Sequence, residues 1–357
     1  MTITANTAPQ TTQPAAPAVS PEPIMRIAAG FMAAKHLFAA SELGLFEALH
    51  DAPATLEALA ARTGLTPRSA RISADAMVAL GLLDRDDDRY RNSPLAAAFL
   101  AGDLPGDLRP LLRFWDRISY PAWQGLAQAL AVGPPQEIME LVPEQQQIAC
   151  AGIEAVLAGP ANTLTAALDF AAHRRVLDVG GGTGSWSIAL TRRYPHLRAT
   201  VLDLPVVAEI ARARIAAAGV ADRIDVVAAD ALQDPLPRDH DVFLVANLVH
   251  YHAPDTNRDL LRRIRAAAGH GATLLLADFW TDPTHTEPLQ AALMAGEFAV
   301  HVRDGDVYSV DEVRAWLAAT GWRFRSHLPL AGPQSLIAAT ATATATASAT
   351  ATDQAPR

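Results

Sequence analysis

Two regions of the chain differ in the spacing of their hydrophobic positions. Between residues 24 and 105 apolar side chains recur mostly at helical spacing, whereas from residue 174 short apolar runs alternate with amphipathic stretches. Apolar strands that alternate with amphipathic helices predict an α/β fold, a Rossmann-like, doubly wound parallel sheet. Strands are expected at 175–179, 199–203, 224–228, 242–247, 273–279 and 324–330, helices at 187–193, 206–217, 258–268 and 311–320, and a last antiparallel strand at 335–338.

The N-terminal region is expected to be mainly helical. A first helix is predicted over 24–41, with Ile27, Phe31, Leu37 and Phe38 roughly on one face. The chain then continues into a second short helix at Leu43.

The next segment predicts a winged helix, in which a pair of helices precedes a small hairpin. Thr55 is an N-cap candidate, and Gly64 is placed to end the helix that follows it. Thr66 then caps a third helix that has Pro67 in its first position. Apolar positions on both sides of residues 85–89 predict the hairpin.

This winged helix is predicted to serve packing or dimerisation. A helix that reads DNA presents basic and polar side chains to the bases, but here Arg68 and Arg71 precede a mainly apolar run. The hairpin carries Asp84 and the acidic run 86–88, which repels phosphate. The net charge of −9 points the same way. No nucleic-acid partner is expected, and a winged-helix regulator is kept as an alternative function.

Composition limits the class of protein. The chain has 357 residues, of which 50% are hydrophobic and 19% charged, as in globular proteins of about two domains. No apolar run approaches the ~20 residues of a membrane span, and the start does not resemble a secretory signal. The single cysteine, Cys150, is typical of a reducing cytoplasm.

Both ends have low-complexity composition and are expected to be disordered. The alternating Ala-Thr run near the C-terminus offers little apolar area to bury. The predicted organisation is a tail at 1–23, a winged-helix domain at 24–105, connecting helices at 106–168, a Rossmann-like domain at 169–338 and a tail at 339–357.

The strongest chemical signal is a glycine-rich turn between a buried strand and a helix. Glycines let the backbone approach a ligand closely, and the start of a helix offers free N–H groups. Asp203 ends the next strand, where a carboxylate accepts hydrogen bonds from both ribose hydroxyls of a nucleoside. The loop residues concerned are Gly180, Gly181, Gly182 and Gly184.

The spacing of the loop favours one nucleoside over another. A dinucleotide fingerprint requires G-x-G-x-x-G/A, but Ser185 stands at its last position and Gly184 comes one residue early. Asp178 precedes the loop, where a carboxylate suits an ammonium group and not a pyrophosphate. S-adenosylmethionine has adenosine, a sulfonium and an amino acid, and is therefore the expected cofactor. An NAD-dependent oxidoreductase is the rival interpretation.

Together these motifs resemble the S-adenosylmethionine-dependent O-methyltransferases of the caffeic-acid and bacterial polyketide-tailoring type. The resemblance rests on 178–184 and 202–205 and extends over residues 24–338. It implies a homodimer formed through the winged-helix domain, a small-molecule acceptor, and S-adenosylhomocysteine as product. It also implies that Asp230 faces the adenine amine, that Ala231 lies against the ring, and that Leu204 and Asn247 bind the cofactor.

A pair of histidines, His250 and His252, follows the fourth strand of the sheet. A metal site is not expected, because Pro254 and Asp255 stand where a metallo-hydrolase pattern needs an acid and a third histidine. An imidazole, with an ordinary pKa of ~6.5, suits a general base.

The resemblance assigns the base to His250, with His252 as the alternative, and its orienting acid to Asp278. Tyr251 and His252 replace the Asp and Trp of the family's turn. A second family acid falls on Val307, so that helper is absent or replaced by Asp306.

The acceptor is expected to be a hydroxyl group of a small aromatic or polyketide-type molecule. By the resemblance, the helix 289–301 lines its pocket. The alternatives are methylation of nitrogen, carbon or a carboxylate, or a relative that no longer methylates. The expected pocket residues are Trp115, Trp280, Met294, Phe298 and His301.

Overall fold

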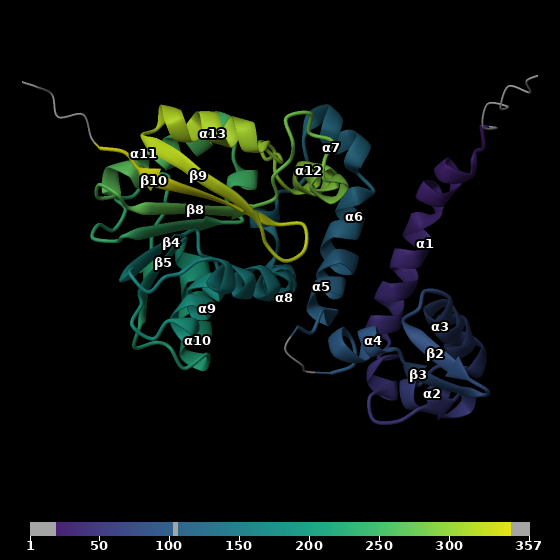
Figure 1. Cartoon of the computed structure of the whole chain (residues 1–357). Coiled ribbons are helices and arrows are strands. Elements are labelled where there is room, and N and C mark those ends of the chain that lie inside the picture. Colours follow the sequence, from purple (N-terminus) through teal and green to yellow (C-terminus); the bar gives the residue numbers. More distant parts are fainter. Residues whose placement is uncertain (1–18, 103–105, 344–357) are drawn as a thin grey trace, which may run out of the picture.

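The structure is a computed structural model that describes residues 19–102 and 106–343. The expected tails therefore lie largely outside the described residues, at 1–18 and 344–357. The described chain forms an N-terminal domain, a set of connecting helices and a sheet domain (Figure 1).

The N-terminal domain has the predicted helix pair and hairpin. The Thr55 hydroxyl accepts from Ala58 N (3.3 Å), the Thr66 hydroxyl accepts from Ser69 N (3.2 Å), and Gly64 has φ +70°. The predicted caps are thus confirmed, and a small strand joins the hairpin in the order β1-β3-β2. The elements are α1 (Glu22–Glu42), η1 (Glu47–Leu49), β1 (Ala54–Thr55), α2 (Leu56–Thr63), α3 (Pro67–Ala79), β2 (Leu83–Asp86), β3 (Arg89–Asn92) and α4 (Pro94–Phe99).

Helix α1 differs from the prediction in how its apolar face is used. Phe38 is buried in the domain core, but Ile27 is 81% and Phe31 51% exposed. The first half of the helix therefore carries apolar side chains that find no cover in a single copy of the chain. The short helix expected at Leu43 is a turn followed by the 3₁₀ helix η1.

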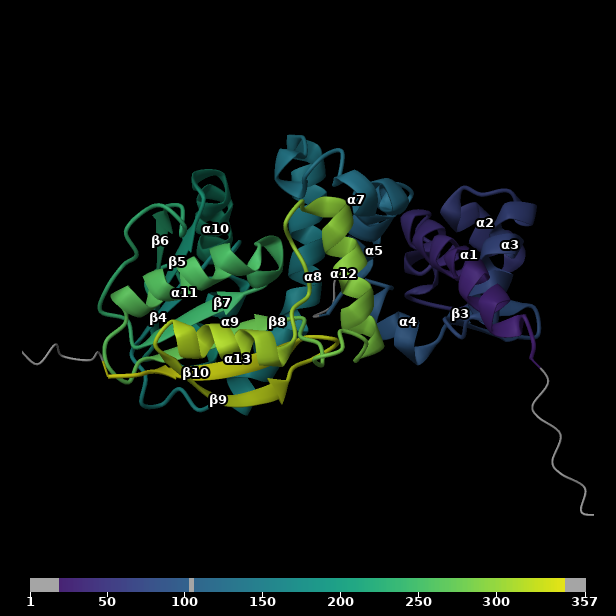
Figure 2. The same ribbon diagram turned by 90° about the horizontal axis from the view of Figure 1, so that it is seen from above.

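The connecting helices lie between the two domains, as both views show (Figures 1 and 2). Helix α12 of the sheet domain packs against α6 and α7 of this set. Among the described residues, no helix is both long and apolar enough to span a bilayer. The connecting elements are α5 (Arg109–Phe114), the π-helix η2 (Trp115–Ser119), α6 (Tyr120–Trp123), α7 (Leu126–Val132), η3 (Ile138–Glu140) and α8 (Pro143–Ala167).

The sheet domain is the predicted doubly wound fold, with strands in the order β6-β5-β4-β7-β8-β10-β9. Strand β10 runs antiparallel to both neighbours, as expected. The strands are β4 (Arg175–Val179), β5 (Arg198–Asp203), β6 (Ile224–Ala228), β7 (Val242–Ala246), β8 (Thr273–Asp278), β9 (Trp322–Pro329) and β10 (Ser335–Ala341), and the helices are α9 (Ser185–Arg193), α10 (Pro205–Ala217), η4 (Val249–Tyr251), α11 (Pro254–Ala267), α12 (Leu289–His301) and α13 (Val310–Ala319).

Helices cover both faces of the sheet. Side chains of α8, α9 and α10 form one core cluster with it, and those of α11 and α13 form the other. Because strands of a parallel sheet all point their carboxyl ends to one edge, the loops after β4, β5, β6 and β7 meet there.

The predicted boundary of the C-terminal tail at residue 339 is wrong. Strand β10 continues to Ala341, and Ala339 and Ala341 are buried. The strand is paired at both edges, with β8 and β9, and its alternate residues Ala338 and Ala339 pack in the two core clusters on opposite faces of the sheet. The Ala-Thr alternation was not a sign of disorder in these residues.

Candidate active site

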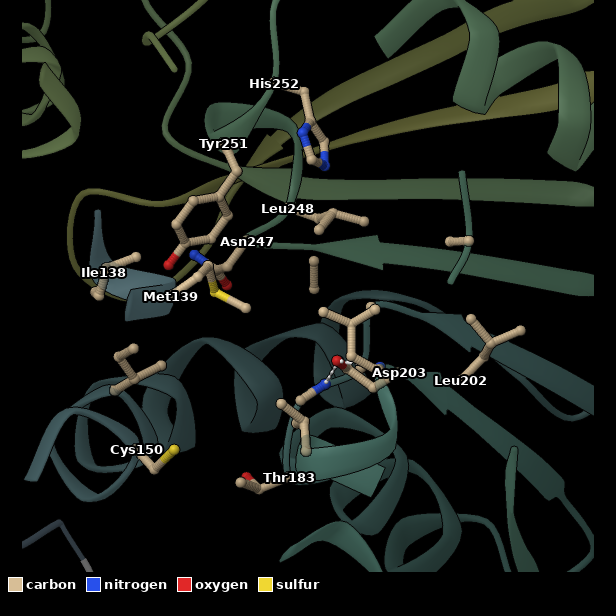
Figure 3. Close-up of a pocket in the computed structure, with 18 of the residues that line it drawn as sticks. Ile138, Met139, Cys150, Thr183, Leu202, Asp203, Asn247, Leu248, Tyr251 and His252 are labelled. Carbon is tan, nitrogen blue, oxygen red and sulfur yellow. Dashed lines mark hydrogen bonds between the residues drawn. The ribbon is translucent and has the colours of Figure 1, made fainter. Parts of the chain in front are cut away.

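A cavity of about 520 Å³ opens where the carboxyl ends of β4, β5, β6 and β7 meet (Figure 3). Its floor is the glycine loop with the residues that follow the strands. Its other wall comes from η3 and α8, through Ile138, Met139, Cys150, Ile153 and Leu157. A volume of this order is typical of small-molecule sites.

The glycine loop needs its glycines for two physical reasons. Gly180 has φ +64°, and a Cβ there would stand 2.7 Å from the Leu248 side chain. Gly182 has φ +57° and no atom within 4 Å of the place its Cβ would occupy. Gly180, Gly181 and Gly182 line the cavity, whereas Gly184, the N-cap of α9, does not.

Asp203 holds the loop and faces the cavity. Its Oδ2 accepts from Gly182 N (2.8 Å), and its Oδ1 accepts from Leu204 N (2.8 Å). Burial raises the pKa of this carboxyl, and the two backbone N–H groups partly oppose that rise. Asp203 and Leu204 both line the cavity, where the sequence predicts cofactor contacts.

The prediction that Asp178 contacts the ligand is not supported. Asp178 is 0% exposed and is not among the residues that line the cavity. Its Oδ2 accepts from the Ser187 hydroxyl (2.7 Å), and a Cβ on Gly181 would stand 2.7 Å from its Cγ. It lies beneath the loop, so it shapes the loop from below. Burial raises its pKa to about 7.

Asp230, Ala231 and Asn247, for which the resemblance implies cofactor contacts, line the cavity. The Asp230 Oδ1 also accepts from Leu232 N (2.8 Å), so this carboxylate stabilises its own turn as well. Asn247 has φ +54°, and its buried Oδ1 has no hydrogen-bond partner among the described residues. An unpartnered buried oxygen beside a cavity suits a ligand that donates a hydrogen bond.

The two sequence-predicted residues His250 and Asp278 meet directly. The Nδ1 of His250 lies 2.6 Å from Asp278 Oδ1, which also accepts from Phe279 N (2.9 Å). Both side chains are buried, at 5% and 1% exposure. His250 lies in η4, just after β7, and Asp278 ends the neighbouring strand β8.

Aromatic rings enclose His250. Phe298 lies parallel to it at 3.8 Å between ring centroids and 11° between planes, and Tyr251 is tilted beside it at 4.4 Å. His250 itself does not line the cavity, but its neighbour Tyr251 does. Burial raises the pKa of the Tyr251 hydroxyl well above its usual range.

His252 lines the cavity but lacks a carboxylate partner of the kind that His250 has. Burial lowers its pKa, the nearby His250 lowers it further, and the nearby Asp230 opposes this. In Figure 3 its ring points away from Tyr251. Asp230 is close enough to raise its pKa, so His252 lies toward the end of the cavity where the resemblance implies the adenine.

Neither residue at the expected position of a second acid makes a hydrogen bond, ion pair or ring contact with the His250 side chain. Val307 is buried with Phe298 in a small apolar cluster. The exposed Asp306 accepts from Val307 N through its own Oδ1, while its backbone N donates to His250 O (3.1 Å). A Cβ on Gly305 would stand 2.3 Å from that same oxygen. This backbone contact, which sequence reasoning missed, supports the histidine turn.

The five predicted pocket residues fall outside the residues that line the cavity. Trp280 is 3% exposed in the sheet core, and its Nε1 donates to Ser335 O (3.0 Å), so that prediction is wrong. Trp115 is partly buried between the cores of the N-terminal domain and the connecting helices. Phe298 covers the base candidate, with Met294 beside it.

His301 belongs to a buried polar cluster that sequence reasoning missed. Its Nε2 lies 3.2 Å from Oε1 of Glu297, which is 8% exposed. Glu297 also accepts from the Ser119 hydroxyl (2.6 Å) and from Trp123 Nε1 (2.5 Å). The cluster fastens α12 to the connecting helices, and no periodic signal in the sequence marked it.

Within residues 19–102 and 106–343, no group of three or more His, Cys, Asp or Glu residues could hold a metal ion.

Comparisons with known proteins show which family this chain matches. Residues 136–323 match the family model of the O-methyltransferase domain, and residues 25–102 match that of the O-methyltransferase dimerisation domain. The 3-hydroxy-5-methyl-1-naphthoate 3-O-methyltransferase of Streptomyces sahachiroi is 36% identical over 302 residues, which cover 83% of this chain and 87% of that protein. The N,N-dimethyltransferase OxyT of Streptomyces rimosus is 33% identical over 328 residues, or 88% of this chain and 94% of OxyT. The solved structure of PigF with SAH is 27% identical, has a TM-score of 0.79, and covers 90% of this chain and 100% of its own.

Proposed function

The chain belongs to the O-methyltransferase family, and from that premise we propose that His250 removes the proton of a hydroxyl group on a small aromatic acceptor. The enzyme is an S-adenosylmethionine-dependent methyltransferase whose cofactor product is S-adenosylhomocysteine. When bound, S-adenosylmethionine supplies a methyl group on a positively charged sulfur, which leaves as a neutral thioether.

The cavity residues fit this cofactor. Asp203 would accept from the ribose hydroxyls, and Asp230 with Ala231 would hold the adenine. The unpartnered Oδ1 of Asn247 suits the ammonium or another donor of the same molecule. Gly182 leaves open space beside the loop, so that the backbone can approach the ligand closely.

The observation that carries the base assignment is the 2.6 Å contact between His250 Nδ1 and Asp278. With Nδ1–H donating to the carboxylate, the lone pair of the ring lies on Nε2. Nε2 makes no hydrogen bond to any described residue, so its lone pair is free to take a proton from an acceptor that reaches the ring.

In the proposed reaction, Nε2 takes the acceptor proton as the acceptor oxygen bonds to the methyl carbon. The carboxylate of Asp278 stabilises the imidazolium that forms. His252 is the weaker base, because it has no such carboxylate and lies toward the adenine.

The acceptor class rests on the relatives and on the cavity wall. The naphthoate enzyme acts on a hydroxyl of a fused aromatic ring, and the wall formed by η3 and α8 is mostly apolar here as well. We infer a flat aromatic or polyketide-type acceptor. The likeness to OxyT supports one second candidate, methylation of an amine.

The exposed apolar half of α1 supports a homodimer. Ile24, Ile27, Phe31 and Met32 are each more than half exposed, within the region that matches the dimerisation domain. A second copy of the chain is the partner proposed to cover them. The exposed wing at 86–88 is acidic, which favours this partner over DNA.

A reducing cytoplasm stays the proposed location. The support is the single cysteine of the chain, Cys150, which cannot form an internal disulfide.

The test is methyl transfer from labelled S-adenosylmethionine to a panel of phenolic aromatics, hydroxylated polyketides and aryl amines, with S-adenosylhomocysteine measured in parallel. Labelled methyl ether supports the proposed reaction, and labelled amine alone supports the second candidate. His250→Ala is expected to lower kcat by about 10²–10⁴-fold, with His252→Ala as the matched control that loses far less. A larger loss in His252→Ala would contradict the assignment of the base.

A further inference from the structure

We propose that the Tyr251 hydroxyl recognises an oxygen atom of the acceptor, namely a ring carbonyl or carboxylate beside the hydroxyl that is methylated. The inference rests on the proposed function, because it assigns a feature to the acceptor of that reaction. It makes Tyr251 a specificity-determining residue, distinct from the base.

The position of Tyr251 is the first support. The residue follows His250 directly and lines the cavity that His250 does not line. Its ring lies 4.4 Å from the His250 ring, centroid to centroid. Figure 3 shows it reaching from the loop after β7 into the cavity, on the side of Ile138 and Met139. An acceptor whose hydroxyl meets His250 must therefore pass beside Tyr251.

The hydroxyl of Tyr251 is the second support. It makes no hydrogen bond to any described residue, although most of its side chain is covered. Because burial keeps its pKa high, the group stays protonated and acts as a donor at working pH. A covered donor without a partner is costly, and a ligand oxygen would remove that cost.

The apolar part of the wall cannot compete with such a ligand, and the Asn247 amide, which also lines the cavity, makes no hydrogen bond to the Tyr251 hydroxyl. The facing wall contains Ile138, Met139 and Ile153, which have no side-chain oxygen. Two carboxylates that also line the cavity are already engaged. Glu154 accepts from the Thr183 hydroxyl and pairs with Arg214, and Glu137 lies 3.8 Å from the Arg303 guanidinium.

The combination selects a class of molecule. Apolar walls favour a flat ring system. One fixed hydrogen-bond donor favours a ring system that carries an oxygen atom able to accept that hydrogen bond. Since the rings of Tyr251 and His250 lie 4.4 Å apart, centroid to centroid, we place that oxygen on the same part of the acceptor as the reacting hydroxyl. A carbonyl and a carboxylate share this chemistry, and they differ in charge.

The experiment measures binding to the enzyme–S-adenosylhomocysteine complex by calorimetry, which does not depend on methyl transfer. Three probes are compared: 1-hydroxyanthraquinone, with a carbonyl beside its hydroxyl; 1-hydroxy-2-naphthoic acid, with a carboxylate there; and 1-naphthol, with neither. The variant is Tyr251→Phe, which keeps the ring against His250. The matched control is Tyr194→Phe, whose hydroxyl bonds to the backbone oxygens of Thr165 and Leu168, away from the cavity.

The expected result is a selective loss in Tyr251→Phe. Binding of the preferred oxygen-bearing probe falls about 3- to 10-fold if that probe is the carbonyl and about 10- to 100-fold if it is the carboxylate. Binding of 1-naphthol and of S-adenosylhomocysteine is unchanged, and Tyr194→Phe changes nothing.

Three results would overturn the proposal. One is an equal change for all three probes, another is no binding of any probe to the wild-type enzyme, and the third is a fall in cofactor affinity that shows the hydroxyl to contact the cofactor. Failure of the proposed function would look different. The selective loss would be seen, but no probe and no panel compound would be methylated.

Discussion

Replacing Asp278 by Asn tests whether this carboxylate acts through His250. Its Oδ1 accepts from both His250 Nδ1 and the Phe279 backbone N–H, and the side chain is 1% exposed. Asparagine has nearly the same shape but no charge. If its NH₂ group faces the ring, Nδ1 must accept and the proton moves to Nε2, the atom proposed to act as base. If its oxygen faces the ring, the imidazolium loses its counter-charge.

The size of the effect follows from the geometry of the pair. Two unit charges about 4 Å apart interact by about 4 kcal/mol at an effective dielectric constant of about 20. That energy corresponds to about a 10³-fold change in rate, which lies within the ~10²–10⁴-fold usually supplied by a general base. We therefore expect Asp278→Asn to lower kcat about 10³-fold. The affinity for S-adenosylhomocysteine should be unchanged, because Asp278 does not line the cavity.

The assay is single-turnover transfer of labelled methyl to an acceptor identified in the panel, for Asp278→Asn, His250→Ala and the double variant. If Asp278 acts only through His250, the double variant is no slower than His250→Ala, because residues that act as a unit are not additive. A double variant slowed by the product of the two single effects would refute this reasoning. So would an Asp278→Asn enzyme with wild-type turnover. Thermal unfolding of each variant shows that the fold is intact.

Three further predictions concern the buried groups and the loop. Asp178 has a pKa raised from 3.8 to about 7, so the folded chain keeps a proton that the unfolded chain has lost, and its contribution to stability falls as pH rises through this range. Asp178→Asn should therefore stabilise the ligand-free protein about 3 kcal/mol more at pH ~8 than at pH ~5; equal gains in thermal unfolding at both pH values would contradict this. Glu297→Ala should lower the free energy of unfolding in urea by about 3–5 kcal/mol, because it leaves a buried histidine without its partner; a loss below about 1 kcal/mol would show that the cluster contributes little. Gly180→Ala should weaken S-adenosylhomocysteine binding at least ~10-fold in calorimetry, since its Cβ would meet the Leu248 side chain; Gly219→Ala, also at positive φ but in open space, is the control that should bind normally.

The parts of the site that the sequence predicted well are those set by a few consecutive residues. The glycine loop and Asp203 belong to one strand–loop–helix–strand unit, so their spacing fixes their relation in space. The same holds for the caps at Thr55 and Thr66. The doubly wound fold was also predictable, because the spacing of the hydrophobic residues indicates the alternation of strands and helices.

The direction of side chains at the ends of buried strands was not predictable. Both faces of β4 and β8 are covered by helices, so their residues are apolar on either side and show no alternation. A sequence with no alternation does not say that Asp178 points below the loop while Asp278 points toward the histidine. Trp280, just past β8, was misplaced for the same reason.

Contacts between segments far apart in sequence could not be predicted from the hydrophobic pattern either. Phe298 on α12 stacks on His250, and Glu297 beside it bonds to Ser119 of the connecting helices. The spacing of apolar residues on α12 says which face is buried but not which ring or carboxylate lies opposite. The exposed face of α1 shows a related limit, because a pattern predicts burial without saying whether the same copy or another one provides the cover.

Because the cofactor end of the cavity depends on local contacts and the acceptor end on distant ones, substitutions can change which acceptor the enzyme binds. The cofactor end of the cavity depends on one continuous unit from β4 to Asp203, in which Gly180 and Gly182 admit no larger side chain without strain. The acceptor end is assembled from η3, α8, Tyr251 and residues 302–304 just after α12, which come from distant parts of the chain. Substitutions at the acceptor end can alter shape and hydrogen bonding without disturbing the cofactor or the pairing of His250 with Asp278. A family built on this plan can therefore keep one reaction while its acceptors diverge. Tyr251 is the position that we propose sets the acceptor preference of this chain.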